Sequence, residues 1–207
     1  MVDNKILSTI DFGGNLRAVS KIMTYYQQEK LENPSTLRNN EVSIINHTGR
    51  GTERYNDVFE DGPSHYSTLA FGIPKNFTSL YKDNQIIVNL TKGSLSNYFD
   101  NYNNVISLMV HEDHHTKQGF TSAQYNQHSG YYELDAYVKQ FSHWSFGGTT
   151  QDFKSHMIGN ALYELNRYHR AGHSDYVNST LTRLNSALRG NGRIVYNEET
   201  GRYEHTY

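Results

Sequence analysis

The feature that most constrains this chain is a pair of histidines inside an apolar, helix-forming segment. His111 and His115 are four residues apart and follow the apolar run Val105 to Val110. Residues at this spacing lie on one face of an α-helix, so both imidazoles can bind the same cation. Glu112 is rotated about a third of a turn away, where a carboxylate can accept a proton from water without binding the metal. The H-E-x-x-H pattern therefore predicts a helix that carries two zinc ligands and a general base.

Composition narrows the kind of metal site and the classes of partner. The chain has 207 residues, no Cys and 11 His, so any metal must be held by imidazoles and carboxylates. The formal net charge of -2 argues against a strongly basic nucleic-acid binder. We expect no membrane partner either, because no apolar run approaches the roughly 18 residues of a membrane span. Residues 1–14 also have no apolar run long enough for a signal peptide, so we expect either that the protein is not exported by that route or that it is an excised piece of a longer chain.

A catalytic zinc needs a third protein ligand and an open fourth position. Glu133 lies 18 residues after His115, at the start of the next helical pattern, and it is the expected third ligand. Asp135 is the alternative, although it points elsewhere if Glu133 faces the metal. His128 is a weaker candidate in a predicted loop. The competing interpretations are a helix-dipole role for Glu133 and a solvated, His-rich helix end.

A peptidase also needs a donor that stabilises the oxyanion formed on the attacked carbonyl. Several Tyr and His side chains lie in or beside the predicted Glu133 helix, and most of them must serve packing or the surface. His143 and Tyr131 are the candidates for this catalytic role. His114 is expected to be a surface residue, because it points away from the face shared by the His pair.

The predicted fold is α+β, as a single domain spanning residues 1–207. Residues 1–100 form a mixed part with a short sheet, residues 101–190 a helical part with the zinc site, and residues 191–207 a hairpin tail. The predicted strands are Val42 to Ile45, Ser67 to Ile73 and Gln85 to Leu90. The predicted helices are Asn15 to Leu31, one through Val105 to His115 capped by Gly119, Tyr132 to Phe141, Asp152 to Ala171, and one from Ser174 or Asp175 to Leu188. We expect substrate to add as a strand to the exposed edge of Gln85 to Leu90.

The His111 to His115 run, followed by Glu133-Leu134-Asp135-Ala136-Tyr137, resembles the gluzincin class of metallopeptidases. The resemblance covers roughly residues 85–144. It implies a small zincin-like fold, His111, His115 and Glu133 as ligands of Zn²⁺, Glu112 as general base, and a peptide or protein substrate. In larger members an acidic residue stands four positions after the third ligand and orients a ligand His, whereas this chain has Tyr137.

A second resemblance involves Phe12-Gly13-Gly14, Met23 to Tyr26 and Leu69 to Gly72, which look like the variable C-terminal tips of bacterial RHS-repeat proteins. Such tips are often toxic effector enzymes, metallopeptidases among them. This implies delivery as part of a larger bacterial chain, with a parent RHS-type chain and an immunity protein as partners.

Two rival functions stay open at this point. One is a non-catalytic metal-binding or structural module of a secreted or phage-related bacterial protein. The other is a zinc enzyme that hydrolyses a different bond, such as an amide in a cell-wall peptide. A site closed by a fourth protein ligand, such as Asp135 or His128, would favour the module.

Overall fold

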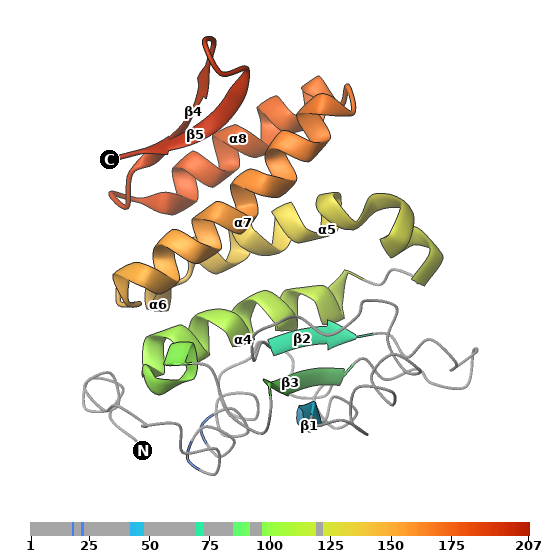
Figure 1. The fold of residues 1–207 in the computed structure, drawn as a ribbon, viewed down its shortest axis with the longest axis vertical. Coiled ribbons are helices and arrows are strands. Elements are labelled where there is room, and N and C mark those ends of the chain that lie inside the picture. The colour runs from blue at the N-terminus through green and yellow to red at the C-terminus, as the bar shows by residue number, and fades with distance from the viewer. Residues whose placement is uncertain are drawn as a thin grey trace.

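A computed structural model of the chain describes residues 42–47, 69–72, 85–91, 97–118 and 122–207, together with Ala18 and Ile22. The described part is a mainly helical α+β fold that ends in an antiparallel hairpin. Figure 1 shows the elements stacked from a three-stranded sheet through four long helices to the hairpin. In chain order they are β1 (Val42–His47), β2 (Leu69–Gly72), β3 (Gln85–Thr91), η2 (Asn97–Asp100), α4 (Tyr102–Lys117), α5 (Ser122–Ser142), α6 (Trp144–Gly147), α7 (Gln151–Arg170), α8 (Ser174–Leu188), β4 (Arg193–Asn197) and β5 (Arg202–Thr206).

Most predicted elements are confirmed within the described residues, with differences at their ends. The three predicted strands correspond to β1, β2 and β3, and the tail forms the predicted hairpin of β4 and β5. The helix α5 begins at Ser122 rather than at Tyr132, and η2 and α6 were not predicted. The helix expected at residues 15–31 lies mostly outside the described residues, but Ala18 and Ile22 are helical and pack against the core. None of the helices in the described part is both long and apolar enough to cross a membrane.

The three-stranded sheet has the order β1-β3-β2, which places β3 in its centre. β3 pairs in parallel with β1, with Val42 opposite Ile86, and antiparallel with β2, with Leu69 opposite Val88. The prediction that residues 85–90 form an edge strand is therefore wrong. Its unbroken apolar run is typical of a strand inside a sheet, and strand neighbours are fixed by long-range pairing that local sequence does not encode.

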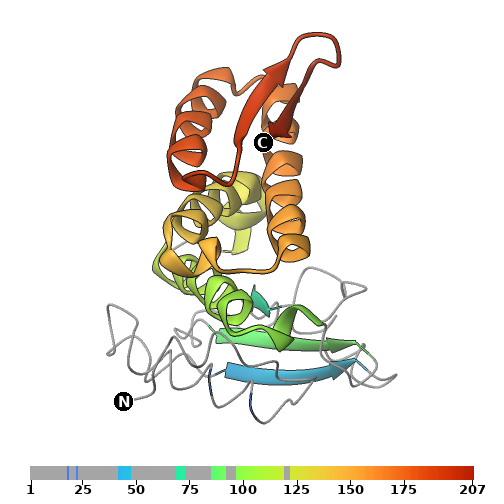
Figure 2. The ribbon, with the colours of Figure 1, turned by 90° about the vertical axis from the view of Figure 1, so that its left-hand side faces the viewer.

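The helix α4 is the buried centre of the fold, between the sheet and α5 (Figure 2). Its apolar side chains Val105, Ile106 and Met109 are fully buried. Asn101 begins the helix as its N-cap, because its side chain accepts hydrogen bonds from the backbone N–H groups of residues 103 and 104. The second half of the helix is unusual, because four of its ionisable side chains are also buried, namely His111, Glu112, Asp113 and His115. Buried ionisable groups must be paired, so this half is the place to look for a site.

The C-terminal hairpin is attached to the helices by two asparagine side chains. Asn166 of α7 donates to the carbonyl of Tyr203 at 3.0 Å and accepts from its N–H at 2.8 Å. Asn185 of α8 makes the same pair of bonds with Ile194, at 2.9 and 2.6 Å. Ile194 and Tyr203 are buried, so their backbone groups require these partners. The hairpin thereby ties α7 to α8, and both of these helices pack against α5.

Candidate metal centre

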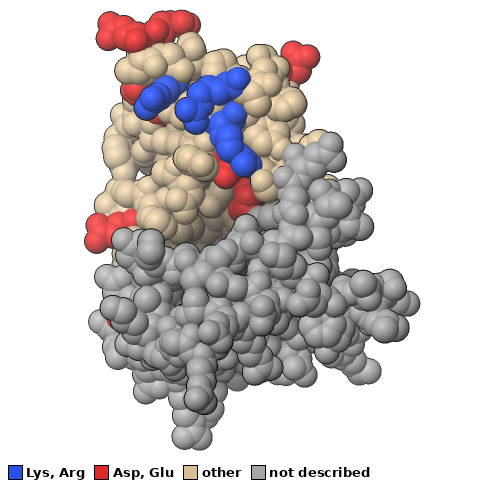
Figure 3. All heavy atoms as spheres, turned by 45° about the vertical axis from the view of Figure 1, so that its right-hand side comes forward, with Lys and Arg blue, Asp and Glu red and all other residues tan. Residues whose placement is uncertain are grey.

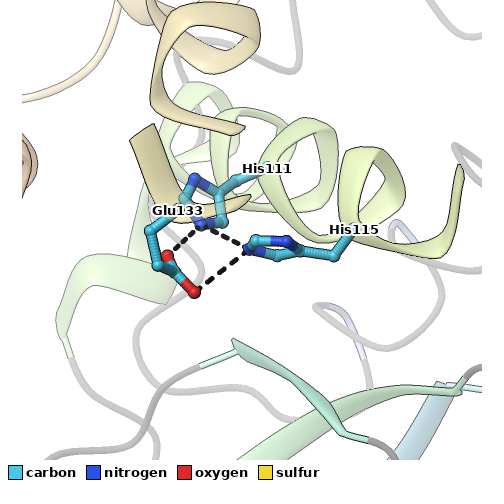
Figure 4. A group of neighbouring side chains, drawn as sticks. All are labelled: His111, His115 and Glu133. Atoms are coloured by element: carbon cyan, nitrogen blue, oxygen red, sulfur yellow. Dashed lines mark hydrogen bonds and ion pairs between the residues drawn. The ribbon is translucent and has the colours of Figure 1, made fainter. Parts of the chain in front are cut away.

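Three potential metal ligands converge where α4 meets α5. The Nε2 atoms of His111 and His115 lie 3.1 Å apart. The two carboxylate oxygens of Glu133 lie 3.2 Å from His111 Nε2 and 3.4 Å from His115 Nε2. Figure 4 shows the two imidazoles of α4 and the carboxylate of α5 pointing toward one another. One ligand atom from each residue falls within 4.8 Å of the others, so a single small cation could contact all three.

Helical spacing places each of these side chains. His111 and His115 share one face of α4, as their four-residue separation dictates. On α5, Tyr137 stands one turn after Glu133, and the centroid of its ring lies 4.6 Å from that of His111. Glu133 and Tyr137 therefore mark the face of α5 that packs on the His pair.

The charges of the cluster keep its carboxylate ionised. Burial opposes ionisation of Glu133, but the neighbouring His115 and His111 hold the pKa of that carboxyl well below its usual range. Burial also opposes a charged His115, yet the Glu133 carboxylate raises the pKa of His115 to about 9. A carboxylate that is paired electrostatically with two imidazoles is suited to bind a cation, because a metal ion can replace the protons that these groups share.

The predicted general base is buried beside this cluster. Glu112 is only 6 % exposed. The negative charge of Glu112 helps to raise the pKa values of two neighbouring side chains, His115 and Tyr137. The donor atoms at the centre are two imidazole nitrogens and carboxylate oxygen, which is a donor set that fits a divalent metal.

Comparison with known proteins agrees with this chemistry. The family described as metallopeptidase toxin 2 matches residues 68–195, which include the whole cluster and more than half of the chain. The chain belongs to this family. It is therefore a metallopeptidase toxin domain, and the family implies a metal ion. Searches of curated proteins and of solved structures returned no match.

Two glutamines contact the toxin's His pair, and the sequence analysis missed both of them. Gln140 Oε1 lies 3.2 Å from His111 Nδ1, and Gln118 Oε1 lies 2.8 Å from His115 Nδ1. One signal in the sequence could have found Gln140, because it stands seven residues after Glu133 and thus on the same face of α5. Tyr137, in the position where larger gluzincins have an acid, packs its ring on His111.

The two residues predicted to stabilise the oxyanion have other surroundings. His143 begins α6 as its N-cap, where its Nδ1 accepts from the N–H of Ser145 at 3.4 Å. His143 lies ten residues after Glu133, which corresponds to a rise of about 15 Å along a helix axis. Tyr131 stands two positions before Glu133, which turns it to another side of α5, and its ring packs on Tyr176. The structure thus brings neither His143 nor Tyr131 to the cluster, since closeness in sequence did not put them on its face.

The alternative ligands are also engaged elsewhere. Asp135 accepts a hydrogen bond from His114 Nε2 at 2.6 Å and forms an ion pair with Arg183 of α8. His114 was predicted to be a surface residue. Through this bond it instead links α4 to α5. Figure 3 shows one face of the molecule, on which basic side chains of the described part lie beside acidic ones. His128 is exposed at a kink inside α5, with φ -130° and ψ 27°, rather than in a loop between helices.

Proposed function

We propose that this toxin domain is a zinc peptidase of the gluzincin type, with His111, His115 and Glu133 as the zinc ligands. The observation that carries the proposal is the convergence of their ligand atoms. Ligands placed tetrahedrally at zinc distances of about 2.0–2.1 Å are about 3.3 Å from one another. The two Nε2 atoms, 3.1 Å apart, are close to that spacing. Each of them also has one carboxylate oxygen of Glu133 nearby, Oε2 at 3.2 Å from His111 and Oε1 at 3.4 Å from His115. Three protein ligands leave the fourth position for water or substrate.

The proposed mechanism assigns Glu112 as the general base. Bound zinc would supply a Lewis acid that polarises the scissile carbonyl and makes an attacking water more acidic. Glu112 takes the proton from that water and returns it to the leaving amine. Its buried position supports this role, because a carboxylate shielded from solvent holds its proton close to the reacting atoms. Glu133 contributes the negative charge that partly balances the metal.

Substrate binding is proposed along β2 instead of β3. β2 packs against α4, and it has one partner strand among the described residues, namely β3. A peptide added to its other side would have its backbone held in register on a strand that packs against α4, the helix that carries the His pair.

We also propose that the domain acts as the tip of a larger bacterial chain of the RHS type, with an immunity protein as its partner. Membership in a toxin family and the short Gly and aromatic motifs of the N-terminal half support this context. The rival of a non-catalytic metal-binding module is disfavoured by the peptidase family. It is disfavoured further because Asp135, a candidate fourth ligand, pairs with His114 and Arg183.

The test is the substitution Glu112→Gln, which preserves size and removes the base. The variant should bind zinc and melt as the parent does, while peptide cleavage falls by about 10²- to 10⁴-fold. Zinc content, melting temperature and cleavage of a broad peptide library are measured on both proteins. Equal cleavage by parent and variant would refute the role of Glu112, and a zinc-loaded parent that cleaves nothing would favour the binding module.

A further inference from the structure

The imidazoles of the His pair are each held from the side opposite the cluster by a glutamine. Both Nε2 atoms face Glu133, and both Nδ1 atoms face an amide oxygen. A histidine can offer a metal only a nitrogen without a proton, so the partner of the other nitrogen decides which one is available.

The orientation of the Gln118 amide is fixed by a backbone carbonyl. Its Nε2 donates to the carbonyl oxygen of Tyr132 at 3.0 Å. A carbonyl oxygen only accepts hydrogen bonds, so the amide nitrogen must lie on that side and Oε1 must face His115. Because an amide oxygen also only accepts, His115 must carry a proton on Nδ1, so Nε2 is the nitrogen that can give up its proton to a metal.

The Gln140 amide likewise presents Oε1 to His111, but its second partner is a hydroxyl, which does not by itself fix the orientation of the amide. Its Nε2 donates to the hydroxyl oxygen of Ser107 at 3.0 Å. Gln140 and Ser107 are fully buried, so water does not compete for these bonds. A hydroxyl can either accept or donate, so Ser107 would also bond a carboxylate at position 140.

The two glutamines cross between the ligand-bearing helices in opposite directions. Gln140 reaches from α5 to two residues of α4, His111 and Ser107. Gln118, at the C-terminal end of α4, reaches the backbone of α5 at Tyr132, the residue before Glu133. The same amides that orient the imidazoles therefore also hold the Glu133 segment opposite them.

We propose that Gln118 and Gln140 are positioning residues that keep both imidazoles in the Nδ1–H form, with Nε2 directed at the metal, without adding charge to the site. This inference rests on the proposed zinc ligands. The partner of a ligand histidine is often a carboxylate, which makes the imidazole more basic. Neutral amides give the orientation alone, so the metal keeps more of its positive charge for polarising the substrate.

The experiment compares Gln118→Met and Gln140→Met, which keep much of the volume, with Gln118→Glu and Gln140→Glu. Zinc affinity is measured by competition with a chromogenic chelator, and the imidazole N–H protons of the zinc-loaded proteins are observed by NMR. The matched control is Gln151→Met, since Gln151 is an exposed glutamine that bonds the hydroxyl of Tyr207. Melting temperatures of the metal-free proteins identify variants that fail to fold.

Both Met variants should bind zinc about 10- to 100-fold more weakly than the parent and lose the slowly exchanging Nδ1–H signal of the imidazole concerned. Gln140→Glu should keep the parent's affinity or exceed it, because Ser107 can donate to a carboxylate. Gln118→Glu should weaken binding, because its carboxylate would face the Tyr132 carbonyl. The control should not change.

Three results would overturn the inference. Affinity within about threefold of the parent in both Met variants would show that the amides do not position the ligands. A Gln140→Glu variant that folds but binds as weakly as Gln140→Met would show that Gln140 acts only by packing. A parent that binds no zinc would instead remove the proposed function, and this inference with it, so the two failures are distinguishable.

Discussion

Removing one asparagine that holds the C-terminal hairpin should measurably destabilise the whole helical part. Asn166→Ala deletes two hydrogen bonds to the backbone of Tyr203 and leaves both of its polar groups partly buried without that partner. Each of the two Tyr203 groups that loses its partner costs about 1–2 kcal/mol, the lost bond included, so the two together cost about 2–4 kcal/mol. Alanine returns up to about 0.7 kcal/mol because it favours a helix more than asparagine does. The expected net loss is about 1.5–3 kcal/mol, or a fall in Tm of roughly 3–12 °C for a chain of this length.

The assay is urea and thermal unfolding followed by circular dichroism, with Asn178→Ala as the control. Asn178 is exposed on α8, so its replacement should change the free energy of unfolding by no more than about 0.5 kcal/mol. Asn185→Ala should resemble Asn166→Ala. The double variant should lose less than the sum, because β4 and β5 pair with each other and separate from the helices together. An Asn166→Ala variant as stable as the control would refute the reasoning.

Three further outcomes follow from the site and its supports. Glu133→Ala should lose bound metal while Asp135→Ala retains it, as read by metal analysis, and the reverse would exchange the assigned ligand. The hydrogen bond from His114 holds the pKa of Asp135 below its usual value of about 4, although burial opposes this shift. The ionised carboxylate therefore stabilises the fold above about pH 4, and this contribution is lost as the pH falls through the pKa of Asp135 in the folded protein. Asp135→Asn should therefore be less stable than the parent at neutral pH, and the difference in their free energies of unfolding should shrink in acid. A difference that stays the same as the pH is lowered would contradict this. Gly159→Ala should stabilise the fold by up to about 1 kcal/mol, because its new methyl group would meet nothing within 4 Å. Gly130→Ala should destabilise the fold, because its methyl group would lie 2.5 Å from the ring of Tyr168 on α7. Equal shifts in Tm would refute the close approach of α5 and α7.

The sequence predicted best what depends on local periodicity. The helices α4, α7 and α8 and the hairpin follow from apolar spacing and turn residues, and the ends of these elements differ by only a few residues from the prediction. The closeness of Glu133 to the His pair was expected from an acid at the start of the next helical pattern. In the structure Glu133 lies inside α5, five residues after the kink at His128, because that helix already begins at Ser122. The central position of β3 was not predictable in this way, because it depends on β1 and β2, which are distant in sequence.

The two expected site residues that lie away from the cluster do so for one physical reason, which also shows where the neighbours of Glu133 are found. His143 and Tyr131 were favoured for lying near Glu133 in sequence, yet on a helix the neighbours in space are the residues three, four and seven positions away. The spacing that paired His111 with His115 on α4, applied to α5 from Glu133, leads to Tyr137 and Gln140. Both of these side chains contact His111. A polar residue at such a position is indistinguishable from a surface glutamine until its helix has a partner, so the pairing of α4 with α5 is what gives Gln140 a role.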